Sequence, residues 1–137
     1  MSYTRRLFLK ALGWSGAVLA SLPFAGLRAE TKKLAVGFDK APALKTAGGA
    51  AVLKIKGRQY LFIRESEAVI RVLDAECTHH QCLLGWDVGE KRIKCPCHGS
   101  KFETNGKVVH GPALKDLKAY VARIDGERII FEVEEQP

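Results

Sequence analysis

The sequence of 137 residues predicts an all-β fold. Short runs rich in Val, Ile, Leu and Tyr are separated by turn residues, and Lys54-Ile55-Lys56 alternates as a half-buried strand does. Asp125-Gly126 is a strong hairpin signal. No helical period competes in this region. We therefore expect strands at residues 51–56, 59–64, 68–73, 119–124 and 128–133, with turns at 57–58 and 65–67.

The organisation along the chain indicates a leader at residues 1–29 and one domain at residues 30–137. Residues 32–47 are expected to start as a strand and to continue as an irregular link, with Pro42 and Gly48-Gly49 as breakers. Internal repeats and low-complexity segments are absent from the sequence. A chain of this length behind the leader can bury one hydrophobic core but not two.

Two segments of six residues hold all four cysteines and three of the four histidines. They read Cys-Thr-His-His-Gln-Cys at 77–82 and Cys-Pro-Cys-His-Gly-Ser at 95–100. Each offers one Cys and one His at close spacing, together with a second Cys. Two thiolates and two imidazoles form the ligand set of a Rieske-type [2Fe–2S] centre. The Cys and His pairs are Cys77 with His79 and Cys95 with His98, and the second cysteines are Cys82 and Cys97.

Other chemistries for these segments explain fewer of the residues. A structural zinc site of the Cys2His2 type would use four of them and leave Cys82 and Cys97 without a role. A framework made only of disulfides would give the histidines no role. The Cys95-Pro96-Cys97 spacing is too tight for a redox pair of the Cys-x-x-Cys type, so a thioredoxin-like activity has no support.

The chain resembles the Rieske iron–sulfur proteins, whose two boxes read Cys-Thr-His-Leu-Gly-Cys and Cys-Pro-Cys-His-Gly-Ser. The second box matches letter for letter, and the resemblance covers nearly everything from residue 33 to residue 134. It implies one [2Fe–2S] cluster per chain, held in a lobe at about residues 76–112. The lobe would be inserted between two strands of a small antiparallel β-sandwich. Cys77 and Cys95 would hold the buried iron, and His79 and His98 the outer iron.

The resemblance also implies a disulfide between Cys82 and Cys97 that ties the two cluster loops together. Only part of the family has this disulfide, chiefly high-potential proteins that work outside the cytosol. The cysteine usage therefore favours an oxidising compartment. Replacing two thiolates by neutral imidazoles leaves the oxidised cluster formally neutral, which raises the potential to about −150 to +300 mV, against about −400 mV for plant-type ferredoxins.

Several positions around the boxes bear on the potential and on docking. Ser100 lies where the family's hydroxyl donates a hydrogen bond to a cluster sulfur, so we include it among the cofactor-binding residues. Quinol-oxidising members commonly have Tyr where this chain has Phe102, and the missing hydroxyl should lower the potential. They have Leu and Gly where this chain has His80 and Gln81. His80 is either a solvated loop residue, or a residue that contacts the partner or shifts the protonation of a ligand histidine.

Three further positions are expected to have structural roles. His110 is not expected to be a ligand. The stretch 111–113, Gly-Pro-Ala, resembles the family's proline loop, which shields the third side of the cluster. Trp86 is expected to be a packing residue of the lobe rather than an electron relay.

The N-terminal segment resembles a twin-arginine export signal. Thr4 to Lys10 gives a polar residue, Arg5-Arg6, apolar residues and a lysine, directly before an apolar run at 11–27. No acidic residue precedes Glu30. Twin-arginine export moves folded proteins, which suits a cluster assembled before crossing. Cleavage after Leu27-Arg28-Ala29 and retention as a membrane anchor both remain open.

Charge excludes a nucleic-acid role. The formal net charge is +7, but four of the 22 Lys and Arg lie in the leader, and the remainder shows no basic cluster interleaved with aromatics. We expect one-electron transfer on the periplasmic side of the cytoplasmic membrane, with a redox protein as partner. That partner is either a periplasmic dehydrogenase, as for the small subunit of arsenite oxidase, or the cytochrome b of a quinol-oxidising bc-type complex. Short length, Phe102 and the polar loop tip favour the first.

Overall fold

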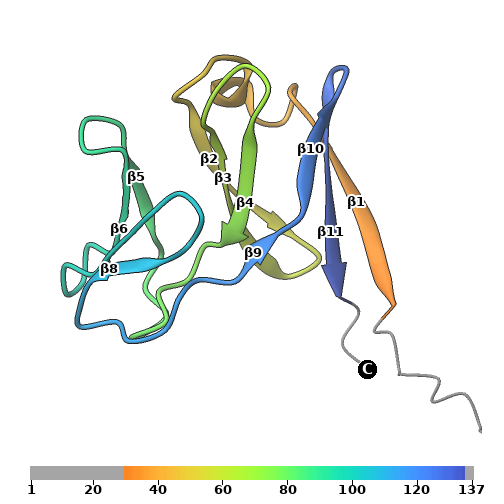
Figure 1. Ribbon diagram of the computed structural model, residues 1–137. Coiled ribbons are helices and arrows are strands. Elements are labelled where there is room, and N and C mark those ends of the chain that lie inside the picture. The colour runs from red at the N-terminus through yellow and green to blue at the C-terminus, as the bar shows by residue number, and fades with distance from the viewer. Residues whose placement is uncertain (1–29, 135–137) are drawn as a thin grey trace, which may run out of the picture.

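The computed structural model describes residues 30–134, and the fold is built of three antiparallel sheets. Figure 1 shows them side by side, with the third sheet at one end of the molecule. The first sheet has the order β1-β11-β10, the second β2-β3-β4-β9 and the third β5-β6-β7-β8. The all-β prediction is therefore confirmed. The strands of the first two sheets are β1 (Thr31–Gly37), β2 (Ala50–Ile55), β3 (Arg58–Arg64), β4 (Ile70–Asp74), β9 (Ala119–Tyr120), β10 (Ala122–Asp125) and β11 (Arg128–Glu134).

The first and second sheets form the base of the molecule around one hydrophobic core. This core contains Tyr60, Phe62, Tyr120 and Phe131, whose rings meet edge to face at centroid distances of 5.2 to 6.3 Å. Such perpendicular contacts suit the charge distribution of aromatic rings. The link between β1 and β2 contains a short 3-10 helix, η1 (Pro42–Lys45), whose Leu44 is fully buried in the same core.

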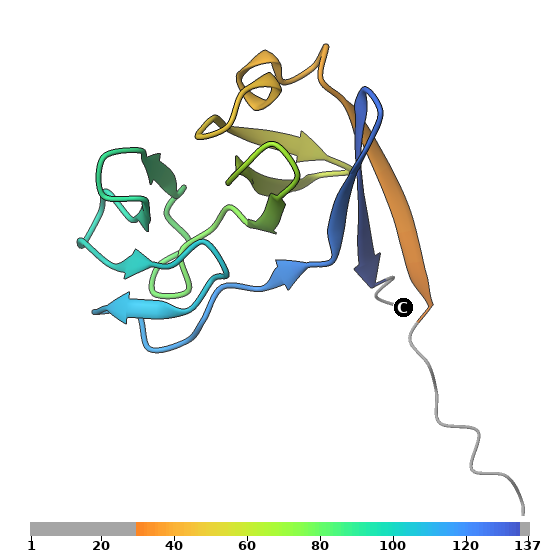
Figure 2. The ribbon, with the colours of Figure 1, turned by 45° about the horizontal axis from the view of Figure 1, so that its top comes forward.

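The third sheet forms a lobe inserted between β4 and β9, as predicted for the family fold (Figures 1 and 2). Its strands are short: β5 (Gly85–Asp87), β6 (Arg92–Lys94), β7 (Lys101–Phe102) and β8 (Val108–His110). A second hydrophobic cluster joins the lobe to β3, because Leu61 and Ile63 point toward the lobe whereas Tyr60 and Phe62 point toward the base core. Since side chains alternate across a strand, the continuous apolar run of β3 contributes to two hydrophobic clusters, so the single core expected from the chain length is wrong.

The strand boundaries differ from the sequence prediction at three places. The turn between β2 and β3 is centred on Lys56 and Gly57, both at positive φ, rather than on residues 57–58, because two such residues match the twist of a tight hairpin. The strand expected from residue 68 begins at Ile70, since the amide of Glu65 donates to the Val69 carbonyl and closes a turn.

The strand expected at 119–124 is two strands in different sheets. Residues 119–120 pair with β4 and residues 122–125 pair with β11, and the chain changes sheet at Val121, whose side chain is exposed. The Asp125-Gly126 hairpin is confirmed, with Asp125 opposite Arg128.

The expected export signal or anchor lies outside the described residues. In the part of the chain that the structure describes, none of the helices has the length and hydropathy that a bilayer crossing requires.

Candidate metal centre

The two Cys/His segments fold into the same local structure. In each, the amide of the first residue donates to the carbonyl of the sixth, and the amide of the fifth donates to the carbonyl of the first. The fifth residue has positive φ in both, +56° for Gln81 and +80° for Gly99. Gly adopts this conformation without steric cost, whereas Gln pays for it in backbone strain. The sequence shows two related boxes, and the structure shows that their backbones are equivalent.

The side chains proposed as ligands divide by burial. Cys77 and Cys95 are 1% and 3% exposed and belong to the hydrophobic cluster between lobe and base. His79 and His98 are exposed, with their ring centroids 4.9 Å apart and their planes nearly perpendicular. Two inner thiols and two outer imidazoles from adjoining loops are the donor set that a Rieske cluster needs, sulfur on one iron and nitrogen on the other.

His79 has an environment that favours the neutral imidazole, the form in which histidine binds a metal. Desolvation of the ring lowers the pKa of His79, and the neighbouring His80 and His98 lower it further by charge repulsion. The ring centroid of His80 lies 4.1 Å from that of His79 and 5.2 Å from that of His98. His80 is therefore part of the same exposed group.

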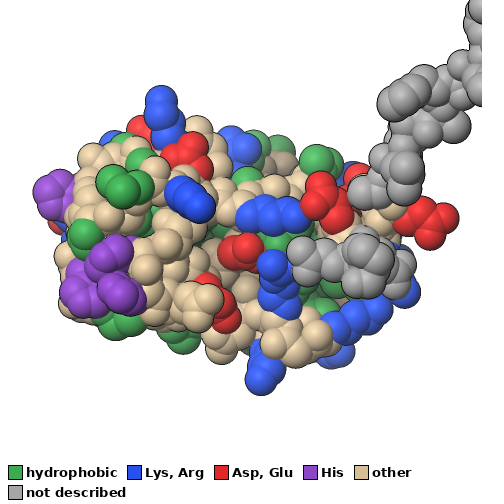
Figure 3. Space-filling view, turned by 90° about the horizontal axis from the view of Figure 1, so that it is seen from below, with side chains coloured by type: hydrophobic (Ala, Val, Ile, Leu, Met, Phe, Trp, Pro, Cys, Tyr) green, Lys and Arg blue, Asp and Glu red, His purple; other side chains and the backbone are tan. Residues whose placement is uncertain are grey.

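The histidines lie at the end of the lobe that faces away from the base. Figure 3 shows a group of His side chains together at this end, with a few hydrophobic side chains beside it. His110 lies on β8, opposite Lys101 of β7.

The disulfide between Cys82 and Cys97 is present and joins the end of the first loop to the second. Cys77 and Cys95 are the free cysteines of the described chain, and both are buried. The Sγ atoms of Cys82, Cys95 and Cys97 all lie within 4.8 Å of one another. Because two of these three sulfurs are bonded to each other, they are not thiolate donors, which leaves Cys77 and Cys95 for a metal.

A third segment, 111–115, closes over both loops. The amide of Ala113 donates to the Ser100 hydroxyl oxygen at 3.0 Å, and the hydroxyl of Thr78 donates to the Lys115 carbonyl at 2.7 Å. Ser100 is fully buried, and within residues 30–134 the structure shows no acceptor for its own hydroxyl hydrogen. A buried donor normally has a partner, and a cluster sulfur beside Cys95 would be one. The residues present therefore fit the cofactor.

Sequence reasoning missed Thr78, which is the second residue of the first box. The family motif contains a Thr at this position, but nothing in the local sequence indicates that its partner lies 37 residues away.

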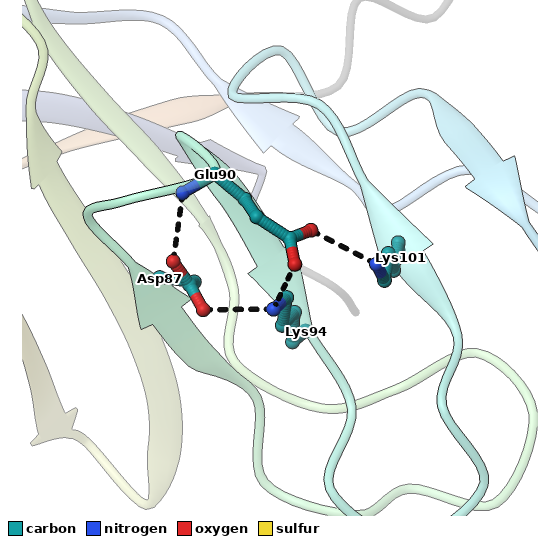
Figure 4. A network of polar contacts seen from close by, with 4 residues as sticks. All are labelled: Asp87, Glu90, Lys94 and Lys101. Carbon is teal, nitrogen blue, oxygen red and sulfur yellow. Dashed lines mark hydrogen bonds and ion pairs between the residues drawn. The ribbon is translucent and has the colours of Figure 1, made fainter.

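A network of charged side chains links the two strands that flank the second loop. The sequence did not indicate this network. Lys94 immediately precedes Cys95, Lys101 immediately follows Ser100, and Glu90 binds both lysines, at 2.7 and 2.9 Å (Figure 4). Asp87 binds Lys94 at 2.7 Å and accepts from the Glu90 amide at 2.8 Å. The hydrogen bonds from the lysines lower the pKa of Glu90, and that from Lys94 lowers the pKa of Asp87.

Two side-chain bonds fix the lobe against the base. Trp86 of β5 donates from Nε1 to the Gly48 carbonyl at 3.0 Å, which agrees with its expected packing role. Thr104 donates to Glu65 at 2.7 Å, and Glu65 also binds Arg71 at 2.9 Å. The hydrogen bond from Thr104 is the largest cause that lowers the pKa of Glu65. These contacts keep the cluster loops in one orientation relative to the base.

Comparison with known proteins supports the same chemistry. Residues 38–121 match the family model of the Rieske [2Fe-2S] domain. The chain is 42% identical over 78 residues to the cytochrome b6-f complex iron-sulfur subunit of Synechococcus sp. strain JA-2-3B'a(2-13), an alignment that covers 56% of this chain and 45% of that protein. A cytochrome b6-f complex iron-sulfur subunit 1 from Nostoc sp. strain PCC 7120 is 39% identical over 73 residues, covering 53% of this chain and 41% of the relative. The chain thus spans less than half the length of these curated relatives.

Solved structures show the same fold. The plasma membrane Rieske protein of Synechocystis PCC 6803 superposes with a TM-score of 0.60 at 26% identity, covering 73% of this chain and 99% of that one. A chain of a hyperthermophilic respiratory Complex III gives a TM-score of 0.52 at 22% identity, with 82% of each chain covered. The matched boxes, their geometry and the family model agree, and this chain belongs to the Rieske [2Fe-2S] domain family, whose cofactor is one [2Fe–2S] cluster.

Proposed function

We propose that this protein transfers single electrons through a cluster held by Cys77 and Cys95 on the inner side and by His79 and His98 on the outer side. The observation that carries the proposal is the pairing of two buried free thiols with two adjacent exposed imidazoles. When bound, the cluster supplies a one-electron redox couple at a potential above that of clusters with four thiolate ligands.

The protein's own residues set access and potential. Burial keeps water from Cys77 and Cys95, and the exposed rings of His79 and His98 give a partner a route to the outer iron. The hydroxyl of Ser100 stabilises the more negative reduced state. Phe102 is fully buried and has no hydroxyl to add a second donor, so we place the potential below that of members with Tyr at this position.

We assign residues 1–29 to a twin-arginine signal or membrane anchor and residues 30–137 to the Rieske domain, with the cluster lobe at about 76–112. The Arg5-Arg6 pair and the apolar run behind it support export to the periplasmic side of the cytoplasmic membrane. The Cys82–Cys97 disulfide supports an oxidising compartment.

Two classes of redox partner follow from different observations. Two features favour an electron-transfer subunit or carrier that works with a periplasmic dehydrogenase. The loop tip carries two exposed polar residues, His80 and Gln81, and residue 102 is Phe, which has no hydroxyl group. The names of the relatives, cytochrome b6-f complex iron-sulfur subunits, favour the Rieske subunit of a quinol-oxidising complex. We place the first ahead, because His80 and Gln81 are exposed and the His80 ring lies beside those of His79 and His98.

Purification of the native protein with its bound partners separates the two classes. Co-purification of a periplasmic dehydrogenase subunit, with reduction of the cluster by that enzyme's substrate, is the result expected. Co-purification of a cytochrome b, with cluster reduction by quinol, would support the second class instead.

The division between ligand and disulfide roles is tested by two substitutions. Cys82→Ser removes the disulfide but no ligand, so the cluster should assemble and then be lost faster. His98→Ser removes an iron ligand, so the normal visible and EPR spectra should be absent. Equal loss in both variants would contradict the assignment.

A further inference from the structure

One free thiol of the lobe, that of Cys95, lies close to both sulfurs of the disulfide. The Sγ atoms of Cys95, Cys82 and Cys97 lie within 4.8 Å of one another, whereas the Sγ of Cys77 lies farther than 4.8 Å from at least one of these three sulfurs. Both free thiols are buried to a similar degree. The lobe therefore contains an internal nucleophile for its own disulfide and a second thiol that serves as an internal comparison.

The chemistry available to this group is thiol–disulfide exchange, in which a thiolate attacks one sulfur of a disulfide and the other sulfur leaves as a thiolate. Attack by Cys95 on the Cys82 sulfur breaks the bond between Cys82 and Cys97 and forms a bond between Cys82 and Cys95. The proton lost from Cys95 is balanced by the one that Cys97 takes up. No oxidant or reductant is consumed.

Two features favour Cys82 as the sulfur attacked. Cys95 and Cys97 are separated by a single residue, Pro96, whose ring fixes its φ, so a bridge between them would close a short and rigid ring. Cys97 is exposed, so its released thiolate is solvated by water, whereas a Cys82 thiolate would be half-buried. The Cys95 side chain is 3% exposed, which keeps external thiols away but does not hinder a neighbour inside the lobe.

We propose that Cys95, whenever it is not bound to iron, attacks the Cys82–Cys97 disulfide and is captured in a Cys82–Cys95 bridge. This proposal has a consequence for cluster assembly, which rests on the proposed role of Cys95 as a ligand. Once Cys95 is bonded to Cys82 it is no longer a thiolate ligand, so the site lacks one of its two inner ligands and a cluster cannot be inserted. Cluster insertion must then precede disulfide formation. A chain that acquires its disulfide first is diverted into a form that cannot be loaded.

The experiment uses the full chain purified with its cluster. One portion is kept loaded, and another is treated with an iron chelator in the absence of external thiol. Both are quenched in acid, alkylated and digested with trypsin, which leaves Cys95 and Cys97 on one peptide and Cys77 and Cys82 on another. Fragmentation between Cys95 and Pro96 by mass spectrometry shows which cysteine of the first peptide carries the bridge and which carries the alkyl group.

The loaded protein should show the alkyl group on Cys95 and the bridge on Cys97. After removal of iron, the alkyl group should shift with time to Cys97, and Cys77 should remain alkylated throughout. Persistence of the Cys82–Cys97 bridge alone would overturn the proposal. Bridges to Cys77 formed as readily as those to Cys95 would do so too, because they indicate scrambling in an unfolded chain.

Two variants and an iron assay distinguish a failure of this proposal from a failure of the proposed function. Each variant lacks one inner ligand, so both are mapped as purified, without a loaded portion. In Cys77→Ser the Cys82–Cys95 bridge should be found, and in Cys95→Ser the Cys82–Cys97 bridge should persist, because the nucleophile is gone. Iron and sulfide analysis of the starting material reports on the cluster itself. A sample without iron would count against the proposed function, while its disulfide map would still test the exchange.

Discussion

The buried hydroxyl oxygen of Ser100 accepts a hydrogen bond from the amide of Ala113 at 3.0 Å, so the second cluster loop and the segment 111–115 are held together at the site. This geometry orients the hydroxyl. Because the Ser100 oxygen accepts from the Ala113 amide, the hydroxyl hydrogen is left to donate to another group, and we assign a cluster sulfur as its acceptor.

Ser100→Ala should lower the reduction potential and the stability together. A hydrogen bond to a charged group contributes about 1.5 to 3 kcal/mol, and for a one-electron couple 1.4 kcal/mol corresponds to about 60 mV. Only the part of this energy that is gained on reduction shifts the potential, so we expect a fall of up to about 130 mV in protein-film voltammetry. Ser100→Thr keeps the hydroxyl and is the matched control. A potential unchanged in Ser100→Ala would contradict the assignment of the donor.

Gln81→Gly should stabilise the first cluster loop. Gln81 has a φ of +56°, a conformation that costs a residue with a Cβ about 1 to 2 kcal/mol, part of which is offset by the greater freedom of Gly in the unfolded chain. We expect a gain of up to about 1 kcal/mol in the free energy of unfolding. Gln81→Ala is the control, since it removes the side chain and keeps the strain. If Ala stabilises as much as Gly, the side chain and not the backbone is responsible.

The charge network of Figure 4 should give the lobe a pH-dependent stability. The pKa of Glu90 is lowered, chiefly by hydrogen bonds from Lys94 and Lys101, so the folded state favours the carboxylate. This contribution is present above the unfolded-state pKa of about 4 and is lost as the pH falls through the lower folded-state pKa. The pKa of Lys94 is raised, so its contribution is lost at the alkaline end, as the pH rises through the folded-state pKa.

Glu90→Gln removes the acceptor shared by the two lysines. Its free energy of unfolding should be below that of the wild type at neutral pH by a small amount, because the network is exposed and is screened by salt. The two proteins should converge in acid and at high ionic strength. A difference that stays constant from neutral to acid pH would show that charge is not its cause.

The sequence predicted those parts of the site whose residues lie close together in the chain. Cys77 with His79 and Cys95 with His98 each lie within four residues of one another, and a resemblance in the boxes was enough to propose them as ligands. The disulfide came from the same resemblance and is confirmed.

What the sequence did not predict depends on contacts between distant segments. The strands of the lobe are two or three residues long, too short to show a period, and were not expected. The change of sheet at Val121 follows from the packing of two sheets, not from the residue itself. The bond of Trp86 to Gly48 joins residues 38 apart in sequence, and the backbone equivalence of the two boxes is visible only from their hydrogen bonds.

The central claim is that one iron has sulfur ligands from this chain and the other has nitrogen ligands. Pulsed EPR of the reduced protein, produced with 15N-labelled histidine, tests it most directly. We predict a [2Fe–2S] signal with hyperfine coupling to two histidine nitrogens, assigned to His79 and His98. A reduced cluster without nitrogen coupling, or a colourless protein that contains zinc in place of iron and sulfide, would contradict it.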